Sequence, residues 1–84
     1  MRALIVDDSK PSRSIVARVL RDQGFDCAEA ANGAEALAAL DAGPLPVLVT
    51  VNWHMPVMDG IELVRRIRGT PSLRRLKVLM VSTE

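Results

Sequence analysis

Four short apolar runs alternate with three segments of helical periodicity, and this alternation admits very few folds. The runs Ala3–Val6 and Val47–Val51 are apolar at nearly every position rather than at alternate positions. Such strands are typical of parallel sheets that are covered on both faces. Strands separated by helices form right-handed crossovers, so residues 1–84 are predicted to form one α/β domain in the order βαβαβαβ.

The first half of the chain contains two predicted helices around a weak second strand. Ser9 has the side chain of a helix N-cap and Pro11 suits a first turn, while Gly24 ends the helix. Its apolar side chains recur at helical spacing at Ile15, Val16, Val19 and Leu20. The second strand is predicted over Asp26–Ala30, a turn at Asn32–Gly33, and an alanine-rich helix over residues 34–42 with Leu37 and Leu40 on its apolar side.

The second half of the chain continues the same alternation. The strand Val47–Val51 is followed by a helix that Asp59 is predicted to cap and that Gly69 ends. The buried stripe of this helix is predicted to be Ile61, Leu63, Val64 and Ile67. After a loop over residues 70–77, Val78–Val81 forms the fourth strand.

Composition excludes several classes of partner. The formal net charge of the 84 residues is +1, so no global field attracts nucleic acid or a membrane. One local basic run is interpreted as solvated surface, because no aromatic residues interleave it: Arg65, Arg66, Arg68, Arg74, Arg75 and Lys77. The lone Cys27 cannot form an internal disulfide, and no apolar run is long enough to span a membrane. A cytoplasmic protein without a nucleic-acid or membrane partner is therefore predicted.

Polar side chains follow three of the four predicted strands. Asp7 and Asp8 end the first strand, Asn52 ends the third, and Ser82 follows the fourth. The carboxyl ends of parallel strands share one edge of the sheet, where ligands collect beside the reversal of strand order. Two adjacent carboxylates repel each other unless a cation or another positive group offsets them, so this edge is predicted to bind a cation.

Other sites on a similar architecture are disfavoured by the residues present. A dinucleotide site needs glycines after the first strand, where this chain has DDSKPS. A zinc site at His54 lacks a second histidine and a cysteine at metal-ligand spacing. A hydrolase triad is disfavoured because no residue is evident that would orient His54, and no enzymatic activity is expected.

Several short motifs together resemble the receiver domain of two-component response regulators, close to the chemotaxis-regulator type. They are IVDDS at residues 5–9, MPVMDG at residues 55–60 and LMVS at residues 79–82. The resemblance covers the whole chain. It implies a flavodoxin-like, doubly wound sheet with the strand order 2-1-3-4.

The resemblance also implies roles for individual residues. Asp8 would bind Mg²⁺ directly and Asp7 mainly through water, together with the backbone carbonyl of His54. Ser82 matches the hydroxyl that moves to meet a phosphoryl group. Asn52 occupies the phosphoacceptor position and is the remaining residue of the metal site. The partner implied by the family is a histidine kinase or a phosphotransfer protein.

Asn52 departs from the family pattern, which has aspartate at this position. An amide oxygen carries no formal charge, so the attacking nucleophile is lost and the pocket keeps two carboxylates rather than three. We therefore expect no ordinary aspartyl phosphorylation and weakened Mg²⁺ binding. Asn52 can instead donate a hydrogen bond to Asp7 or Asp8. The alternative function is a phosphorylation-independent pseudo-receiver that acts through protein interaction or dimerisation.

The second departure from the pattern lies at the end of the sequence. The family continues after the fourth strand with a helix, a fifth strand carrying a lysine, and a last helix. The sheet is therefore predicted to be incomplete, with an open apolar face over the first and third strands and an unpaired edge at the fourth. A homodimer or swapped oligomer that covers this face or pairs this edge is expected.

Overall fold

The computed structural model describes residues 1–52 and 58–81. The elements follow the predicted order, with one short addition before the last strand. They are β1 (Arg2–Val6), α1 (Lys10–Asp22), β2 (Asp26–Ala30), α2 (Gly33–Ala42), β3 (Leu48–Asn52), α3 (Gly60–Gly69), the 3₁₀ helix η1 (Pro71–Leu73) and β4 (Lys77–Val81).

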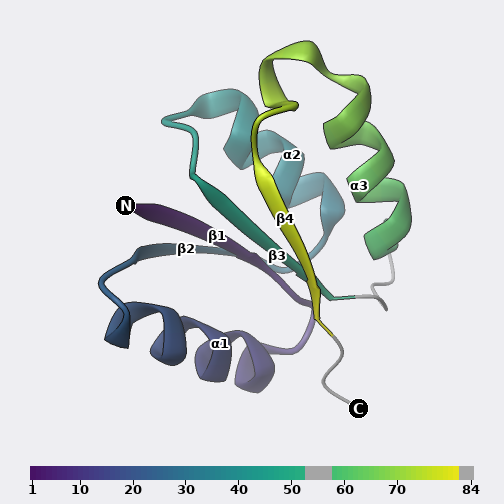
Figure 1. Ribbon diagram of the computed structural model, residues 1–84. Helices are drawn as coiled ribbons and strands as arrows, with labels where there is room; N and C mark the ends of the chain where they lie inside the picture. The colour runs from purple at the N-terminus through teal and green to yellow at the C-terminus, as the bar shows by residue number, and fades with distance from the viewer. Residues whose placement is uncertain (53–57, 82–84) are drawn as a thin grey trace.

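The four strands form one parallel sheet in the order β2-β1-β3-β4. In the register of this sheet Leu4 lies beside Ala28 and Val49, and Val49 lies beside Val78. The helix α1 lies on one face of the sheet, whereas α2 and α3 lie on the other (Figure 1). The predicted doubly wound fold and strand order 2-1-3-4 are confirmed.

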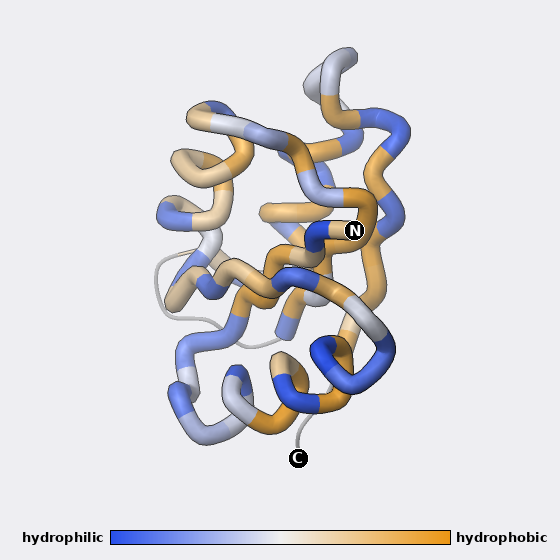
Figure 2. Tube along the Cα trace, turned by 90° about the vertical axis from the view of Figure 1, so that its left-hand side faces the viewer, coloured by the Kyte–Doolittle hydropathy of each residue, from blue (hydrophilic) through white to orange (hydrophobic). Residues whose placement is uncertain are grey.

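The main core lies between the sheet and the helices α2 and α3. Hydrophobic residues dominate the strands along the Cα trace (Figure 2), and alternate strand residues such as Val6 and Val51 point into this core. Leu63 and Ile67 fill it from α3 with no exposed surface. Each fully buried side chain of this size contributes about 1.5–3 kcal/mol. Met58 and Met80 pack against the same cluster.

The opposite face of the sheet is covered more fully than the sequence indicates. Ile5 is 1% exposed and Thr50 is 3% exposed, so the prediction of an open face over β1 and β3 is wrong at these positions. The helix α1 lies on this face and contacts β1 and β2, and its Ala17 is fully buried. Apolar side chains do remain exposed at Leu79 on β4 and at Ile15 and Val19 on α1.

Element boundaries agree with prediction to within about one residue, and the differences have local causes. The strand β2 has its predicted bounds, whereas β3 begins and ends one residue later and therefore contains Asn52. Asn32 caps α2, so Gly33 is its first residue rather than part of a turn. Ile61 is exposed, contrary to prediction, because it lies about 200° around the helix from Leu63.

Side-chain caps place the starts of the three helices at the carboxyl edge of the sheet. The Ser9 hydroxyl accepts a hydrogen bond from the Ser12 N–H at 3.4 Å, and Asp59 accepts one from the Glu62 N–H at 2.8 Å. At α2, Asn32 accepts from the N–H of the glutamate three residues later, whose carboxylate accepts in turn from the N–H before the cap. This reciprocal arrangement is a variant of the capping box, in which the glutamate accepts from the residue before the N-cap rather than from the N-cap itself. The predicted caps at Ser9 and Asp59 are confirmed.

Candidate functional site

Asp7 and Asn52 meet where the neighbouring strands β1 and β3 end. The Asn52 amide Nδ2 donates a hydrogen bond to Asp7 Oδ1 at 3.1 Å, and the two residues are 9% and 3% exposed. This is the contact expected if asparagine relieves the charge of the acidic pair. The ends of β1 and β3 therefore come together at Asp7 and Asn52, as predicted.

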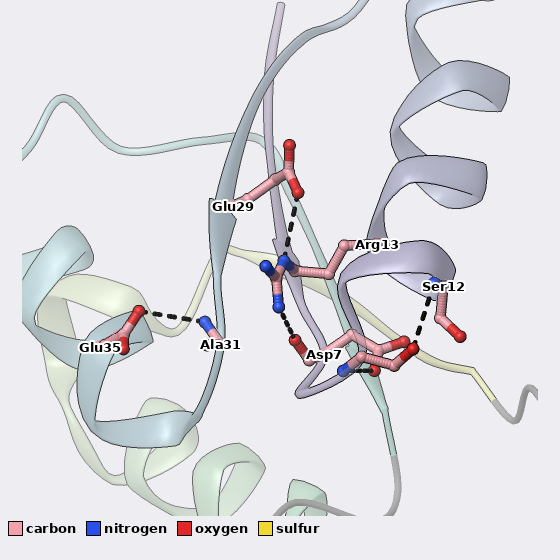
Figure 3. A network of polar contacts seen from close by, with 7 residues as sticks. Asp7, Ser12, Arg13, Glu29, Ala31 and Glu35 are labelled. Atoms are coloured by element: carbon pink, nitrogen blue, oxygen red, sulfur yellow. Dashed lines mark hydrogen bonds and ion pairs between the residues drawn. The ribbon is translucent and has the colours of Figure 1, made fainter.

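Asp7 is held by more than one element. Its Oδ1 also accepts a hydrogen bond from the Ser9 N–H at 2.9 Å, and its own N–H donates to the Ala30 carbonyl at 3.0 Å. Its carbonyl oxygen accepts from Arg13 Nη1 at 2.6 Å (Figure 3). Across residues 1–52 and 58–81, every buried side-chain nitrogen or oxygen has a hydrogen-bond partner. The polar groups of Asp7 are thus connected to α1, β2 and β3 at once.

A second charged pair adjoins this network. Arg13 Nε lies 3.2 Å from Glu29 Oε1, and the side chains of Arg13 and Glu29 are 14% and 34% exposed. Neither residue is predicted as a site residue from the sequence. In retrospect, two features of the sequence indicate them. Arg13 is a basic residue near the start of a helix, where the helix dipole disfavours a cation, and Glu29 is a charged residue within a parallel strand.

Asp8 differs sharply from Asp7 in its surroundings. It follows the end of β1 and is exposed, whereas Asp7 is buried and hydrogen-bonded. Carboxylate and amide oxygens are ligands suited to Mg²⁺, which commonly keeps several waters when bound by one or two carboxylates. Within the described part of the chain, no group of three or more His, Cys, Asp or Glu side chains gathers to hold a metal. Asp7, Asp8 and Asn52 nevertheless supply oxygen atoms of the kind that suits Mg²⁺.

Two other predicted site residues cannot be placed. His54, whose backbone carbonyl is an expected Mg²⁺ ligand, lies outside the described residues. Ser82, the expected switch hydroxyl, also lies outside them. Their roles remain predictions.

Gly60, the last residue of the MPVMDG motif, allows a close approach between two elements. A Cβ at this position would lie 2.5 Å from the Asn52 carbonyl oxygen and 2.9 Å from Met80 Cε. The first residue of α3 thus approaches the last residue of β3 so closely that a side chain does not fit. Glycine here allows the start of α3 to close over the end of β3.

Cys27 lies away from the acidic edge and has a structural environment. It is partly buried in β2, and its Sγ lies 3.8 Å from the Ala17 carbonyl oxygen. Burial raises the pKa of the Cys27 thiol; Arg21 opposes this shift, and Asp26 and Glu29 reinforce it. A thiol of this kind is a poor nucleophile at neutral pH.

Pockets lie at the opposite edge of the sheet, where the strands begin. One of about 730 Å³ is lined by side chains that include Phe25, Val47 and Leu76. Another of about 680 Å³ lies between the end of α2 and η1. Neither includes Asp7 or Asn52, so the acidic site is separate from both.

The fold and this acidic strand-end site define a class of signalling module. The chain belongs to the family of response regulator receiver domains. Residues 3–84 match the sequence pattern of this family. Receiver domains are signalling proteins rather than enzymes. Within the described residues, no helix is both long and apolar enough to cross a membrane.

Similar proteins include two chemotaxis regulators. The chain is 47% identical over 85 residues to chemotaxis protein CheY of Pseudomonas aeruginosa, covering 100% of this chain and 68% of that protein. It is 45% identical to chemotaxis protein CheY-3 of Vibrio cholerae, covering 100% of this chain and 65% of that protein. The chain thus spans about two thirds of the length of these relatives.

Solved structures show the same fold. The structure of Vibrio cholerae chemotaxis protein CheY4 matches with a TM-score of 0.88 and 35% identity, over 99% of this chain and 68% of that one. The response regulator TrrA of Thermotoga maritima, in complex with Mg²⁺ and BeF, matches with a TM-score of 0.88 and 29% identity. That match covers 99% of this chain and 70% of the TrrA chain.

Proposed function

We propose that this chain is a receiver module that does not accept a phosphoryl group on β3, because Asn52 occupies the acceptor position. In the receiver family the acceptor is a carboxylate that attacks a phosphoryl group in line, with Mg²⁺ offsetting the charge. Asn52 ends β3 beside Asp7, where that carboxylate is expected. Its amide has the shape of aspartate without the charged nucleophile.

The hydrogen bond from Asn52 to Asp7 is the observation that supports this proposal best. An aspartate in place of Asn52 would set two carboxylates against each other in a buried site, and a cation would then be needed to offset them. The amide Nδ2 supplies a donor instead, 3.1 Å from Asp7 Oδ1. The hydrogen bond thus offsets part of the negative charge of Asp7. In a receiver with aspartate at the acceptor position, a metal ion offsets this charge.

The chain binds Mg²⁺ with weakened affinity in this proposal. The residues that would hold it are Asp7, Asp8, Asn52 and the backbone carbonyl of His54. When bound, the ion neutralises the acidic pair. The related TrrA protein was solved with Mg²⁺ and BeF, which supports metal binding by this fold. Two carboxylates in place of three predict a lower affinity for this chain.

The family implies a histidine kinase or a phosphotransfer protein as partner, in the cytoplasm. A second candidate function is a phosphorylation-independent interaction module that forms a homodimer. It is favoured by β4, which lies at one edge of the four-stranded sheet and exposes 55% of Leu79. An apolar edge strand of this kind is a template for pairing with a second chain.

A Mg²⁺ titration separates the two candidates. The probe is the fluorescence of Trp53, which adjoins Asn52 in the sequence, and the control variant is Asn52→Asp. A retained receiver pocket predicts quenching by millimolar Mg²⁺ in the parent chain and tighter binding, by about 10-fold, in Asn52→Asp. Absence of any response in both chains would contradict the retained pocket and support the interaction module.

A further inference from the structure

Arg13 is a largely buried cation at a position where helix electrostatics disfavour it. It is the fourth residue of α1, and the first turn of this helix contains no acidic residue. A helix N-terminus carries partial positive charge, so a cation nearby is destabilised. The Arg13 side chain is nevertheless only 14% exposed. Specific hydrogen-bond or ion-pair partners must therefore stabilise the Arg13 guanidinium in this position.

Those partners lie on two different strands. Arg13 Nη1 donates a hydrogen bond to the Asp7 carbonyl oxygen at 2.6 Å, at the end of β1. Arg13 Nε pairs with Glu29 Oε1 at 3.2 Å, on β2. Figure 3 shows the guanidinium between these two acceptors. A planar guanidinium that holds two acceptors through different nitrogens is fixed in orientation.

The Asp7 carbonyl belongs to the peptide that joins Asp7 to Asp8. Because a peptide group is planar, holding its oxygen sets the plane from which Asp8 departs. The Asp7 carboxylate is held separately, by the Ser9 N–H and the Asn52 amide. Arg13 therefore constrains the main chain of the acidic pair, whereas Ser9 and Asn52 constrain one of its side chains.

We propose that Arg13 is a positioning residue for the acidic pair and that Glu29 orients its guanidinium. Arg13 holds the Asp7–Asp8 peptide and thereby constrains the main chain from which the exposed Asp8 side chain departs. This proposal rests on the proposed cation pocket for its effect on Mg²⁺. Its effect on the acidic turn does not depend on any metal.

The charge of Arg13 acts on a metal ion in the opposite sense to its positioning role. A cation beside the pocket repels Mg²⁺, so a purely electrostatic role predicts that removing Arg13 tightens Mg²⁺ binding. A positioning role predicts that removal weakens it. Pairing with Glu29 offsets the charge of Arg13, and we therefore expect positioning to dominate. The sign of the change in affinity distinguishes the two roles.

The test measures two quantities in Arg13→Gln. The first is Mg²⁺ affinity, followed by amide chemical shifts in the Asn52→Asp background, where binding is expected to be tighter. The second is hydrogen exchange of the Ser9 amide in the parent chain. We expect Mg²⁺ affinity to fall about 10-fold, as for other residues that orient metal ligands, and Ser9 exchange to accelerate. Glu29→Gln should change both quantities in the same direction but less.

The matched control is Arg66→Gln. Arg66 Nε lies 3.2 Å from Glu62 Oε1, the same separation as in the Arg13–Glu29 pair, but both side chains are well exposed on α3. This substitution should leave both quantities unchanged. Arg13→Lys keeps the charge but not the planar fork, so it should behave like Arg13→Gln rather than like the parent.

Three results would overturn the proposal. They are an Arg13→Gln variant that matches Arg66→Gln in both quantities, one that binds Mg²⁺ more tightly, and an Arg13→Lys variant that matches the parent. If the Asn52→Asp chain binds no Mg²⁺ at all, the proposed cation pocket is wrong, and Ser9 exchange alone decides the role of Arg13. If Arg13→Gln does not fold, the same two measurements on Glu29→Gln decide it.

Discussion

The Asn52 amide nitrogen lies 3.1 Å from Asp7 Oδ1, at the point where β3 and β1 end as neighbours. The same oxygen accepts the Ser9 N–H at 2.9 Å, so one buried carboxylate oxygen has two N–H donors. Hydrogen bonds to a charged acceptor are stronger than those between neutral groups. The buried carboxylate of Asp7 is thus stabilised by two N–H donors that the protein itself supplies.

Asn52→Asp should destabilise the fold in metal-free buffer. The substitution replaces an N–H donor to Asp7 by a second carboxylate in a buried site, and we expect a loss of about 1–3 kcal/mol in the free energy of unfolding. Urea unfolding measures it, with and without Mg²⁺. Added Mg²⁺ should restore stability. A variant as stable as the parent without metal would contradict the role given to Asn52.

Gly60→Ala should also be destabilising, for a steric reason. The added methyl group would lie 2.5 Å from the Asn52 carbonyl oxygen, and backbone must move to accept it. We expect a loss of about 1–3 kcal/mol by urea unfolding. Gly69 is the matched control, because a Cβ there meets nothing within 4 Å. Equal effects of Gly60→Ala and Gly69→Ala would show that the close approach has no energetic importance.

The thiol of Cys27 should react slowly and only at high pH. Because burial raises its pKa, the folded chain retains the thiol proton at pH values where the unfolded chain has lost it. The resulting stability is fully present below the pKa of the unfolded thiol and is lost as pH rises through that of the folded thiol. Alkylation by iodoacetamide should therefore be slower in the folded chain than in urea. Equal rates at the same pH would contradict this environment.

Leu79→Lys tests the proposed homodimer. Leu79 is exposed on the edge strand β4, and a lysine there opposes pairing between edges. Sedimentation velocity should show a dimer for the parent at micromolar concentration and a smaller species for the variant. Ile61→Lys, at an exposed position on α3, is the control and should leave association unchanged. A folded, monodisperse parent monomer would refute the dimer.

The sequence predicts those features that depend on local pattern or on strand ends. The bounds of β2, the caps at Ser9 and Asp59, and the meeting of Asp7 with Asn52 are of this kind. The last follows because neighbouring parallel strands bring their carboxyl ends to one edge, wherever the exact boundary falls.

Contacts between side chains distant in sequence could not be predicted in the same way. Arg13 and Glu29 are 16 residues apart and share no periodic pattern, so only the packing of α1 on β2 brings them together. The approach of Gly60 to the Asn52 carbonyl is a backbone contact, which hydropathy does not record. Ile61 was assigned to the wrong side of α3 because apolar character alone does not fix helical phase.

Intact-mass spectrometry after incubation with acetyl phosphate and Mg²⁺ is the most direct test of the proposed loss of the phosphoacceptor. The parent chain should keep its mass, because the Asn52 amide cannot attack a phosphoryl group, whereas Asn52→Asp should gain one phosphoryl group. A stoichiometric phosphoryl adduct on the parent chain, mapped to the pocket of Asp7, Asp8 and Asn52, would contradict the proposal.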